Sequence, residues 1–392
     1  MMEAWRKIRL GDACKTNADS YSSKEGWDFV NYLDTGNIIN NRIDAIQYID
    51  VKCEKLPSRA RRKVKNGSII YSMVRPNQRH FGIIKSQPKN FLVSTGFAVI
   101  DVDASVLDSD FLYYLLTQAS LIEVLHAIAE QSVSAYPSIK ASDIEDLEIE
   151  IPDLVIQKKI ADVLCSLDRK ITQNVEINKN LEEQARAIFK NWFIDLTPFS
   201  TDGSLPLGWR GSKVNEIVEF HDAKRIPLSN AMRVNMEKIY PYYGATSCMD
   251  YVDDYIFEGT YLLLGEDGTV IDKNGFPILQ YVDGKFWVNN HAHILTGKTG
   301  FSVEWLYLMF SMTKVDSIVT GAVQPKISQS NLKKIALIIP PFDVLSSFDR
   351  IIQPMFVKLR NNRLENMRLA ELRDFLLPRL MSGEIDVSDI AL

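Results

Sequence analysis

Arginine and amide side chains crowd one short segment in the first half of the chain. The segment Arg75-Pro76-Asn77-Gln78-Arg79-His80 directly follows an apolar run at 68–74 that predicts a β-strand. Arginine can donate two hydrogen bonds to guanine, and asparagine or glutamine can pair with adenine in the same way. The alternative is a turn with ordinary surface charge. The residue types suggest contacts with base edges for Arg75, Asn77, Gln78, Arg79 and His80.

A basic run precedes this segment. Five of the seven residues at 59–65 are arginine or lysine, which is enough to neutralise several phosphate groups. A solvated surface loop would have the same composition. The candidate phosphate contacts are Arg59, Arg61, Arg62 and Lys63.

The second half of the chain carries a different polar set. Glu266-Asp267-Gly268-Thr269 and Trp287-Val288-Asn289-Asn290-His291-Ala292-His293 offer carboxylates, amides, imidazoles and an aromatic ring. A carboxylate can accept a hydrogen bond from the cytosine amine, and an amide suits adenine. Tyr242-Tyr243-Gly244-Ala245-Thr246 adds further polar edges. The candidates here are Tyr243, Thr246, Glu266, Lys273, Trp287, Asn289, Asn290, His291 and His293.

Two of these histidines admit a different chemistry. His291 and His293 are two residues apart on a predicted strand, so both rings should project from one face. With Glu266 or Asp267 as a third ligand they could hold a metal ion. The same carboxylates with Lys273 would resemble a nuclease site, so a stand-alone metal-dependent nuclease is the enzymatic alternative. The interpretation that we prefer is a charged loop that binds a partner.

Motifs of other enzyme classes are incomplete. Gly297-Lys298-Thr299 lacks the first glycine of a phosphate-binding loop, because Ala292 stands in its place. Ile339-Pro340-Pro341-Phe342 lacks the asparagine or aspartate that would bind an exocyclic base amine for methylation. No Ser/His/Asp or Cys/His arrangement stands out in the sequence. We therefore expect no catalytic activity, no metal and no cofactor.

The elements that must position these residues occur twice. The segment around Pro137 recurs around Pro325, 188 residues later, and Ile149-Glu150-Ile151-Pro152 recurs as Leu337-Ile338-Ile339-Pro340 at the same offset. Short strand-like runs mixed with helical segments predict α+β domains. We expect a domain at 1–152, a long helix at 153–195, a second domain at 196–340, and a second helix with a tail at 341–392.

Each predicted long helix carries apolar residues at alternating steps of three and four. Both seams contain two asparagines at matching positions, and a buried amide needs a partner, so such residues fix helix register. We predict an antiparallel coiled coil in which Asn174 lies near Asn366 and Asn178 near Asn362. The alternative is two independent surface helices. Pro354 lacks a backbone donor and predicts a break or kink in the second helix.

Composition limits the class of protein. The chain has 392 residues, 46% of them hydrophobic and 24% charged, with a formal net charge of −5. Any nucleic-acid surface must therefore be a local patch. Four scattered cysteines without a Cys-x-x-Cys pair argue against a disulfide framework or a cysteine zinc site. No apolar run approaches membrane-spanning length. We expect a cytoplasmic protein with no membrane partner.

In this order, the motifs resemble those of the specificity subunits of type I restriction–modification systems. Gly67-Ser68-Ile69-Ile70 before Arg75 is similar to that family's Gly-Asp-Ile-Leu strand, with Ser68 in place of aspartate. Leu205-Pro206-Leu207-Gly208-Trp209 matches the Leu-Pro-x-Gly-Trp that opens a recognition domain, whereas the first copy keeps only Trp5. Gln324-Pro325 with Ile327-Ser328 also resembles the family's loop before the long helix, and with its repeat around Pro137 it adds Lys326 and Lys140 as candidate contacts.

The resemblance implies a fold and a function. Two target-recognition domains would each contact one half of a bipartite, asymmetric site in double-stranded DNA, and the helices would set the half-site separation. Two methyltransferase subunits would dock against the helices and domains, and cleavage would belong to separate restriction subunits. The chain itself would then be non-catalytic. A structural adaptor whose two domains bind proteins is a further alternative.

Overall fold

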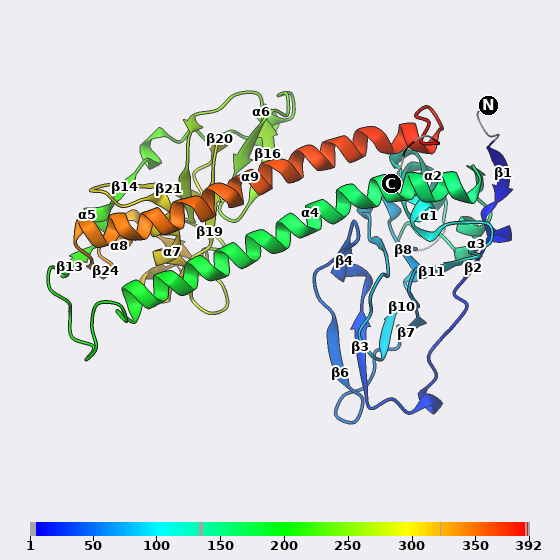
Figure 1. Ribbon diagram of the computed structural model, residues 1–392, viewed down its shortest axis with the longest axis horizontal. Coiled ribbons are helices and arrows are strands. Elements are labelled where there is room, and N and C mark those ends of the chain that lie inside the picture. Colours follow the sequence, from blue (N-terminus) through cyan, green and yellow to red (C-terminus); the bar gives the residue numbers. More distant parts are fainter. Residues whose placement is uncertain (1–4, 133–135, 322, 389, 391–392) are drawn as a thin grey trace. The chain divides into compact units, whose positions relative to one another are not determined.

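The computed structural model describes the chain except residues 1–4, 133–135, 322, 389 and 391–392. The chain divides into two compact units: unit 1 comprises Met1–Thr172 and Asn366–Leu392, and unit 2 comprises Gln173–Glu365. Each unit holds one β-rich domain and part of each of two long helices, α4 (Leu154–Phe189) and α9 (Phe342–Met381) (Figure 1). The predicted α+β class with two repeated domains is confirmed.

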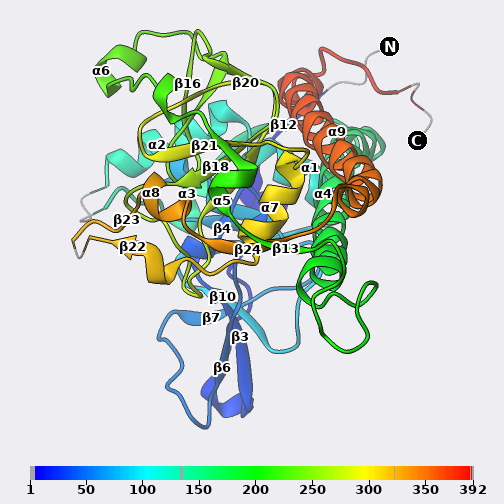
Figure 2. The same cartoon turned by 90° about the vertical axis from the view of Figure 1, so that its left-hand side faces the viewer.

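The domain of unit 1 contains two four-stranded sheets, with the orders β2-β11-β8-β9 and β6-β3-β10-β7, and a β1-β12 pair. Within the two sheets only β3 and β10 run parallel. Figure 2 shows the second sheet gathered at one end of this domain. The strands are β1 (Arg6–Arg9), β2 (Cys14–Thr16), β3 (Phe29–Leu33), β4 (Ile38–Ile39), β5 (Arg42–Ile43), β6 (Gln47–Asp50), β7 (Ala60–Lys63), β8 (Ile69–Ser72), β9 (Phe81–Ile83), β10 (Phe91–Ser94), β11 (Phe97–Val102) and β12 (Glu148–Ile151), and the helices are α1 (Ser109–Leu116), α2 (Ala119–Glu130) and α3 (Ala141–Glu145).

The domain of unit 2 repeats this topology. Its sheets have the orders β14-β21-β18-β19 and β16-β15-β20-β17, its β13-β24 pair matches β1-β12, and β15 with β20 is the matching parallel pair. The strands are β13 (Arg210–Lys213), β14 (Val218–Phe220), β15 (Tyr240–Tyr243), β16 (Cys248–Val252), β17 (Phe257–Glu258), β18 (Tyr261–Gly265), β19 (Leu279–Val282), β20 (Lys285–Val288), β21 (Ala292–Gly297), β22 (Val319–Thr320), β23 (Lys326–Ile327) and β24 (Ala336–Ile339), and the helices are α5 (Val214–Ile217), α6 (Asn230–Arg233), α7 (Val303–Ser311) and α8 (Gln329–Leu332).

The central strands of both domains are buried on both faces. In β8, Ile69 and Tyr71 belong to the cluster that contains α1, whereas Ile70 packs into the cluster of the second sheet. In β18, Leu262 and Leu264 face α7, whereas Leu263 packs toward the second sheet. Successive side chains of a strand point to opposite faces, so a strand between two apolar layers needs a continuous apolar run. This burial places the loops at the strand ends on a rigid support.

The two long helices run antiparallel within each unit. In unit 2, Asn178 of α4 faces Asn362 of α9, and their side chains form a hydrogen bond of 2.8 Å. Asn362 is fully buried, so this amide pair lies inside the helix seam, and the predicted contact is confirmed. In unit 1, the carboxylate of Asp168 on α4 accepts from the guanidinium of Arg373 on α9 at 2.6 Å. Rising residue numbers on α4 pair with falling numbers on α9 inside each unit: 174 with 365 and 178 with 362 in unit 2, and 168 with 373 and 171 with 366 in unit 1.

Two other predictions for the helices have different outcomes. Asn174 donates to Glu365 in unit 2 (2.9 Å), and Asn366 donates to the carbonyl oxygen of Ile171 in unit 1 (3.4 Å). Because Asn174 and Asn366 belong to different units, their proximity stays a prediction. Of the predicted break or kink at Pro354, the break is wrong, because α9 continues through this residue, and the kink stays a prediction. A proline removes a single hydrogen bond, and the buried side chains on either side of it keep the helix packed.

Among the described residues, no single helix has the length and apolar character to cross a membrane. Judged by length and apolar composition alone, α1 and α2 together would be long and apolar enough, and this pair bends by 65° at its break.

Candidate nucleic-acid interface

Two loops of unit 1 are joined where β8 ends. The backbone N–H of Ile139 donates to the carbonyl oxygen of Met73 (2.8 Å), and the N–H of Arg75 donates to that of Pro137 (3.0 Å). The strand-end loop, residues 73–80, is thereby tied to the pre-helix loop, residues 136–140.

Unit 2 forms the same pair of loops at matching positions. The N–H of Ile327 donates to the carbonyl oxygen of Glu266 (2.8 Å), and the N–H of Gly268 donates to that of Pro325 (3.0 Å). Here the strand-end loop comprises residues 266–278 and the pre-helix loop comprises 323–328. Because one backbone pattern supports two different sets of side chains, we take these paired loops as the candidate interface in each unit.

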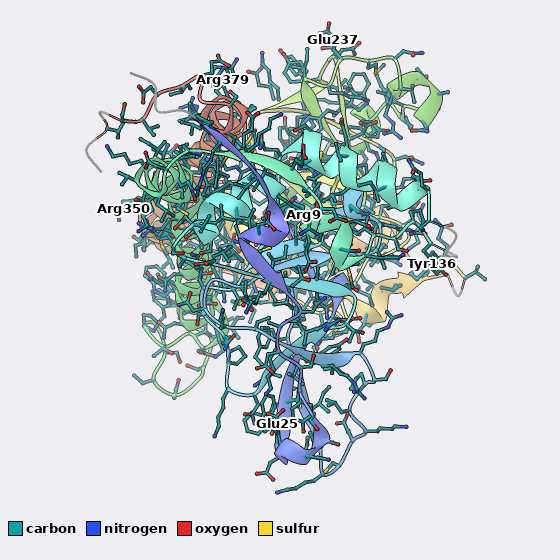
Figure 3. The ribbon with its side chains drawn as sticks, turned by 90° about the vertical axis from the view of Figure 1, so that its right-hand side faces the viewer. Arg9, Glu25, Tyr136, Glu237, Arg350 and Arg379 are labelled. Atoms are coloured by element: carbon teal, nitrogen blue, oxygen red, sulfur yellow. The ribbon has the colours of Figure 1, made fainter. Side chains whose placement is uncertain are left out.

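Two arginines frame the strand-end loop of unit 1. Arg75 and Arg79 flank a 3-10 turn and both have left-handed backbone conformations, with φ of 48° and 57°. The guanidinium of Arg75 lies 5.3 Å from the ring centroid of Tyr136, which comes from the pre-helix loop and lies at the periphery in Figure 3. Both arginines and the two amides between them are exposed. Four hydrogen-bonding side chains are thus available to a partner on one short loop.

The remaining predicted residues near this loop differ in their surroundings. His80 is half-buried, and its Nδ1 lies 2.6 Å from the carbonyl oxygen of Ile38, so this ring is engaged within the domain. Lys140 is exposed immediately before α3.

The basic run occupies β7 and the residue before it. Arg59 and Arg61 are exposed, whereas Arg62 is half-buried and Lys63 forms an ion pair of 2.7 Å with Glu25. Burial lowers the pKa of Arg62, and the hydrogen bond to Glu25 raises the pKa of Lys63. Glu25 is labelled in Figure 3 near the end of this domain. Among the four candidate phosphate contacts, Arg59 and Arg61 are therefore the ones that an external phosphate could reach.

A buried charged network underlies the paired loops of unit 2. His293 on β21 is 1% exposed; its Nδ1 lies 2.6 Å from Asp222 and its Nε2 lies 2.8 Å from the carbonyl oxygen of Ile327. Because both ring nitrogens face oxygen acceptors, both donate and the ring is positively charged. Burial opposes ionisation of Asp222, but the hydrogen bond and charge of His293 and the backbone N–H of Ile294 lower its pKa overall.

Glu266 joins this network between two cations. Its carboxylate lies 2.6 Å from Arg225 and 3.2 Å from Lys326, and Arg225 also donates to the carbonyl oxygen of Ala292 (2.8 Å). Burial opposes ionisation of Glu266, but the Arg225 hydrogen bond and the charge of His293 lower its pKa overall. Ion pairs and hydrogen bonds therefore connect the strand-end loop, the start of β21 and the pre-helix loop.

The same residues do not form the predicted histidine pair. His291 lies in the turn before β21 and hydrogen-bonds to Asp267, so the prediction that both rings project from one strand face is wrong. Asp222, Glu266 and His293 do place ligand atoms within 4.8 Å of one another. A metal ion would need a ring nitrogen with a free lone pair. In this structure both ring nitrogens of His293 are occupied by Asp222 and the carbonyl oxygen of Ile327, so we describe these three residues as an ion-pair network.

The other predicted residues of unit 2 divide into packed and exposed groups. Trp287 donates to the carbonyl oxygen of Ile226 (2.6 Å), and buried Asn289 accepts from the N–H of His291 (2.8 Å). Burial raises the pKa of Tyr243 to about 12. The exposed members are Thr246, Lys273, Asn290 and Lys326.

Asp222 and Arg225, which hold the centre of the network, were not among the residues predicted from the sequence. They lie in the run His221-Asp222-Ala223-Lys224-Arg225 after β14, where the only signal is a cluster of charges. Arg225 is 41 residues from Glu266, and Asp222 is 71 residues from His293. Only the tertiary fold brings these partners together.

Comparisons with known proteins agree with the repeated architecture. Residues 2–183 and 206–373 match the family model of the type I restriction modification DNA specificity domain. The chain is 25% identical over 472 residues to the type I restriction enzyme HindI specificity subunit of Haemophilus influenzae, covering 98% of this chain and 100% of that protein. It is 27% identical over 307 residues to the type I restriction enzyme MjaIX specificity subunit of Methanocaldococcus jannaschii, covering 72% and 70%.

A solved structure has a similar fold. The type I restriction-modification system S subunit from M. genitalium aligns with a TM-score of 0.58 at 18% identity, covering 97% of this chain and 96% of that chain.

Proposed function

We infer the function from one premise, which is that the chain belongs to the type I restriction–modification DNA specificity family. We propose that it is the specificity subunit that selects the DNA sequence on which such a complex acts. In this role the chain carries out no catalytic step. Two methyltransferase subunits would methylate the DNA and separate restriction subunits would cleave it. We expect the complex to act in the cytoplasm.

Each β-rich domain, at 1–152 and 196–340, would contact one half of a bipartite site in double-stranded DNA. The observation that carries this proposal is that both units build the same paired loops from different residues. Unit 1 presents Arg75, Arg79 and the amides between them, which suit guanine and adenine. Unit 2 presents the exposed group of Thr246, Lys273, Asn290 and Lys326. Different donors and acceptors on one scaffold would select an asymmetric site.

The buried candidates would act indirectly. Glu266, Asn289 and His293 are enclosed by their own partners, so they would hold the loops of unit 2 in place while exposed neighbours contact the duplex. Arg59 and Arg61 would contribute phosphate contacts in unit 1.

The long helices, within 153–195 and 341–392, would set the distance between half-sites. Helices of 36 and 40 residues extend about 54 and 60 Å at 1.5 Å per residue. One turn of B-DNA is about 34 Å long, so the helices are long enough to separate half-sites by one turn or more. The amide pair of Asn178 and Asn362 would fix their register.

The outer face of α9 would dock the methyltransferase subunits. Apolar side chains remain exposed along this helix although its inner face is buried, and exposed apolar stripes mark protein interfaces. The exposed side chains are Val357, Leu364, Met367, Leu372 and Phe375.

Genome-wide mapping of methylated bases in the source organism, with and without this chain, tests the proposal directly. We expect one bipartite motif to lose its methylation when the chain is removed. An unchanged methylation map would contradict the proposal. The lost motif would also identify the target sequence.

A binding experiment tests the loop assignment. In a complex reconstituted with its methyltransferase partner, Arg79→Ala should reduce discrimination at one base pair by about 1 to 3 kcal/mol. Arg6→Ala is the control, because Arg6 is equally an exposed arginine of unit 1 but lies on β1, outside the paired loops. Equal affinity of the unaltered complex for all duplex sequences would contradict the specificity role itself.

A further inference from the structure

Unit 1 contains a hairpin that has no counterpart in unit 2. The strands β4 and β5 pair antiparallel between β3 and β6, with Ile38 opposite Ile43 and Ile39 opposite Arg42. The matching strands of unit 2, β15 and β16, are joined by residues 244–247 alone, all of which are described. The hairpin is therefore an addition to the shared scaffold.

The hairpin turn is bonded directly to the candidate interface. Asn40 and Asn41 have φ of 47° and 63°, which is typical of a two-residue type I′ turn. The N–H of Asn40 donates to the carbonyl oxygen of Arg79 (2.9 Å), and the N–H of Asn41 donates to that of Phe81 (2.8 Å). The Oδ1 of Asn41 also accepts from the N–H of Ile83 (2.9 Å). The turn is thus held against the strand-end loop and β9.

The hairpin packs closely against β9. A Cβ atom at Gly82 would lie only 2.7 Å from both Asn41 Oδ1 and Ile38 Cδ1, so glycine permits this approach of the hairpin to β9. The contact of His80 Nδ1 with the carbonyl oxygen of Ile38 adds a second tie. These contacts fix the hairpin relative to Arg79 before any partner binds.

The outer surface of the hairpin and the segment after it is apolar and carries one strong cation. Every residue from 39 to 48 is exposed. Four of them are large and apolar, with exposed fractions of 46% for Ile39, 38% for Ile43, 39% for Ile46 and 62% for Tyr48. The side chain of Arg42 is 87% exposed and has only a distant carboxylate, Asp44, at 3.8 Å. An apolar patch of this kind indicates a contact surface.

We propose that the β4–β5 hairpin enters the major groove of DNA and is a second base-contacting element of unit 1. The inference rests on the proposed function of the paired loops. A two-stranded β-ribbon fits the major groove, where apolar side chains can contact the thymine methyl group and arginine can bind guanine. Ile39 and Arg42, which are opposite each other on the face of the hairpin away from buried Ile38, would make the apolar and the polar contact respectively.

The position of the hairpin favours DNA over a protein as its partner. Because Asn40 is hydrogen-bonded to Arg79, a duplex that contacts Arg79 also meets the hairpin. The turn presents a guanidinium beside exposed amide groups, and these groups match base edges and phosphates. The hairpin would therefore extend the contact that Arg79 begins and would add specificity to one half-site only.

The test uses the complex with its methyltransferase partner and duplexes with every single base-pair change in the target site. The variants are Arg42→Ala and Ile39→Ser. The controls are Arg210→Ala and Ile338→Ser in unit 2, because Arg210 is also an exposed, ion-paired arginine and Ile338 is an equally exposed isoleucine. Circular dichroism and complex formation confirm that each variant folds and assembles.

We expect each hairpin variant to lose discrimination of about 5- to 100-fold at one or two base pairs of the half-site that Arg79→Ala also affects. The other half-site and the control variants should keep the unaltered profile. An unchanged profile for the hairpin variants would overturn the inference. Loss of methyltransferase binding with base preferences intact would also overturn it, because the patch would then be a protein-docking surface.

The outcome for Arg79 separates the two proposals. If Arg79→Ala changes base preference and the hairpin variants do not, only the hairpin inference fails. If the unaltered complex shows no sequence preference, the proposed function fails and the inference fails with it.

Discussion

The two units place different chemistry at one position of the same sheet. In unit 1, buried Ala98 of β11 pairs with Tyr71, whereas in unit 2 the matching residue of β21 is His293, which pairs with Leu264. In both units, the backbone N–H of the next residue along this strand donates a hydrogen bond to a side-chain oxygen. Asn17 accepts it from Val99 at 3.1 Å, and Asp222 accepts it from Ile294 at 2.9 Å.

This difference shows how the scaffold tolerates change. The backbone N–H needs an acceptor in both units, and a neutral amide or a carboxylate satisfies it equally well. The carboxylate of Asp222, however, brings a buried charge, which requires the imidazolium of His293 beside it. The shared sheet thus keeps its backbone pattern while unit 2 uses an ion-pair network to hold loops that unit 1 holds by packing and backbone hydrogen bonds.

The largest expected effect is on stability, and it distinguishes Asp222, the side-chain acceptor in unit 2, from Asn17, the acceptor in unit 1. Asp222→Ala should lower the free energy of unfolding by about 3 to 5 kcal/mol, because it removes the hydrogen-bonded counterion of buried His293 and leaves only Glu266, 3.7 Å from its Nδ1. Asn17→Gly should cost only about 1 kcal/mol, because it removes a neutral hydrogen bond and glycine accepts the left-handed φ of 54°. Urea unfolding measures both values, with hydrogen exchange of β11 and β21 to locate the change. Equal losses of unfolding free energy would show that the buried charge in unit 2 does not add to the effect on stability.

A loss of stability of intermediate size is expected when a contact between α4 and α9 is removed in either unit. Asn362→Ala should cost about 1 to 2 kcal/mol because the buried Oδ1 of Asn178 loses its donor, and salt should not change this loss. Arg373→Ala in unit 1 removes a half-buried ion pair with Asp168 and should cost about 1 kcal/mol, with a smaller loss at high salt. Thermal unfolding at low and high salt measures both. A salt-dependent loss for Asn362→Ala would contradict the assignment.

The smallest expected effect is a dependence of stability on acidic pH, which arises from two carboxylates of unit 2. The pKa values of Asp222 and Glu266 are lowered from 3.8 and 4.5 in the folded protein, so the unfolded chain binds these protons more readily. Their stabilisation is complete above the unfolded values and is lost as pH falls through the folded values. The double variant Asp222→Asn with Glu266→Gln should be less stable at neutral pH.

Urea unfolding between about pH 6 and about pH 3 measures this dependence. The free energy of unfolding should fall less steeply with acid in the double variant than in the unaltered chain. Identical slopes would show that other carboxylates account for the acid sensitivity.

Much of the architecture could be predicted because it depends on local patterns. The duplicated motifs around Pro137 and Pro325 predict two domains of one topology, and the spacing of apolar residues predicts two long helices. The contact of Asn178 with Asn362 followed from one rule, that a buried amide needs a partner. The expected break at Pro354 failed because tertiary packing outweighs one missing hydrogen bond.

The candidate site was less predictable. Arg75, Arg79 and Asn290 were predicted from residue types that can contact bases, and they are exposed. The same reasoning predicted Asn289 and His293, which are buried. A residue's type states which hydrogen bonds it can form, and only its surroundings decide whether a partner inside the domain has already taken them.

The sequence alone thus determined the repeat, the fold class and the helix register, because periodicity and amide placement act through neighbouring residues and matched faces. The tertiary structure decided which polar groups remain available to DNA. Asp222 reaches His293 across 71 residues, and the β4–β5 hairpin reaches Arg79 through backbone bonds that no side-chain pattern encodes. A buried charge must find its counterion wherever the fold provides one, and that position is set by the packing of the whole domain.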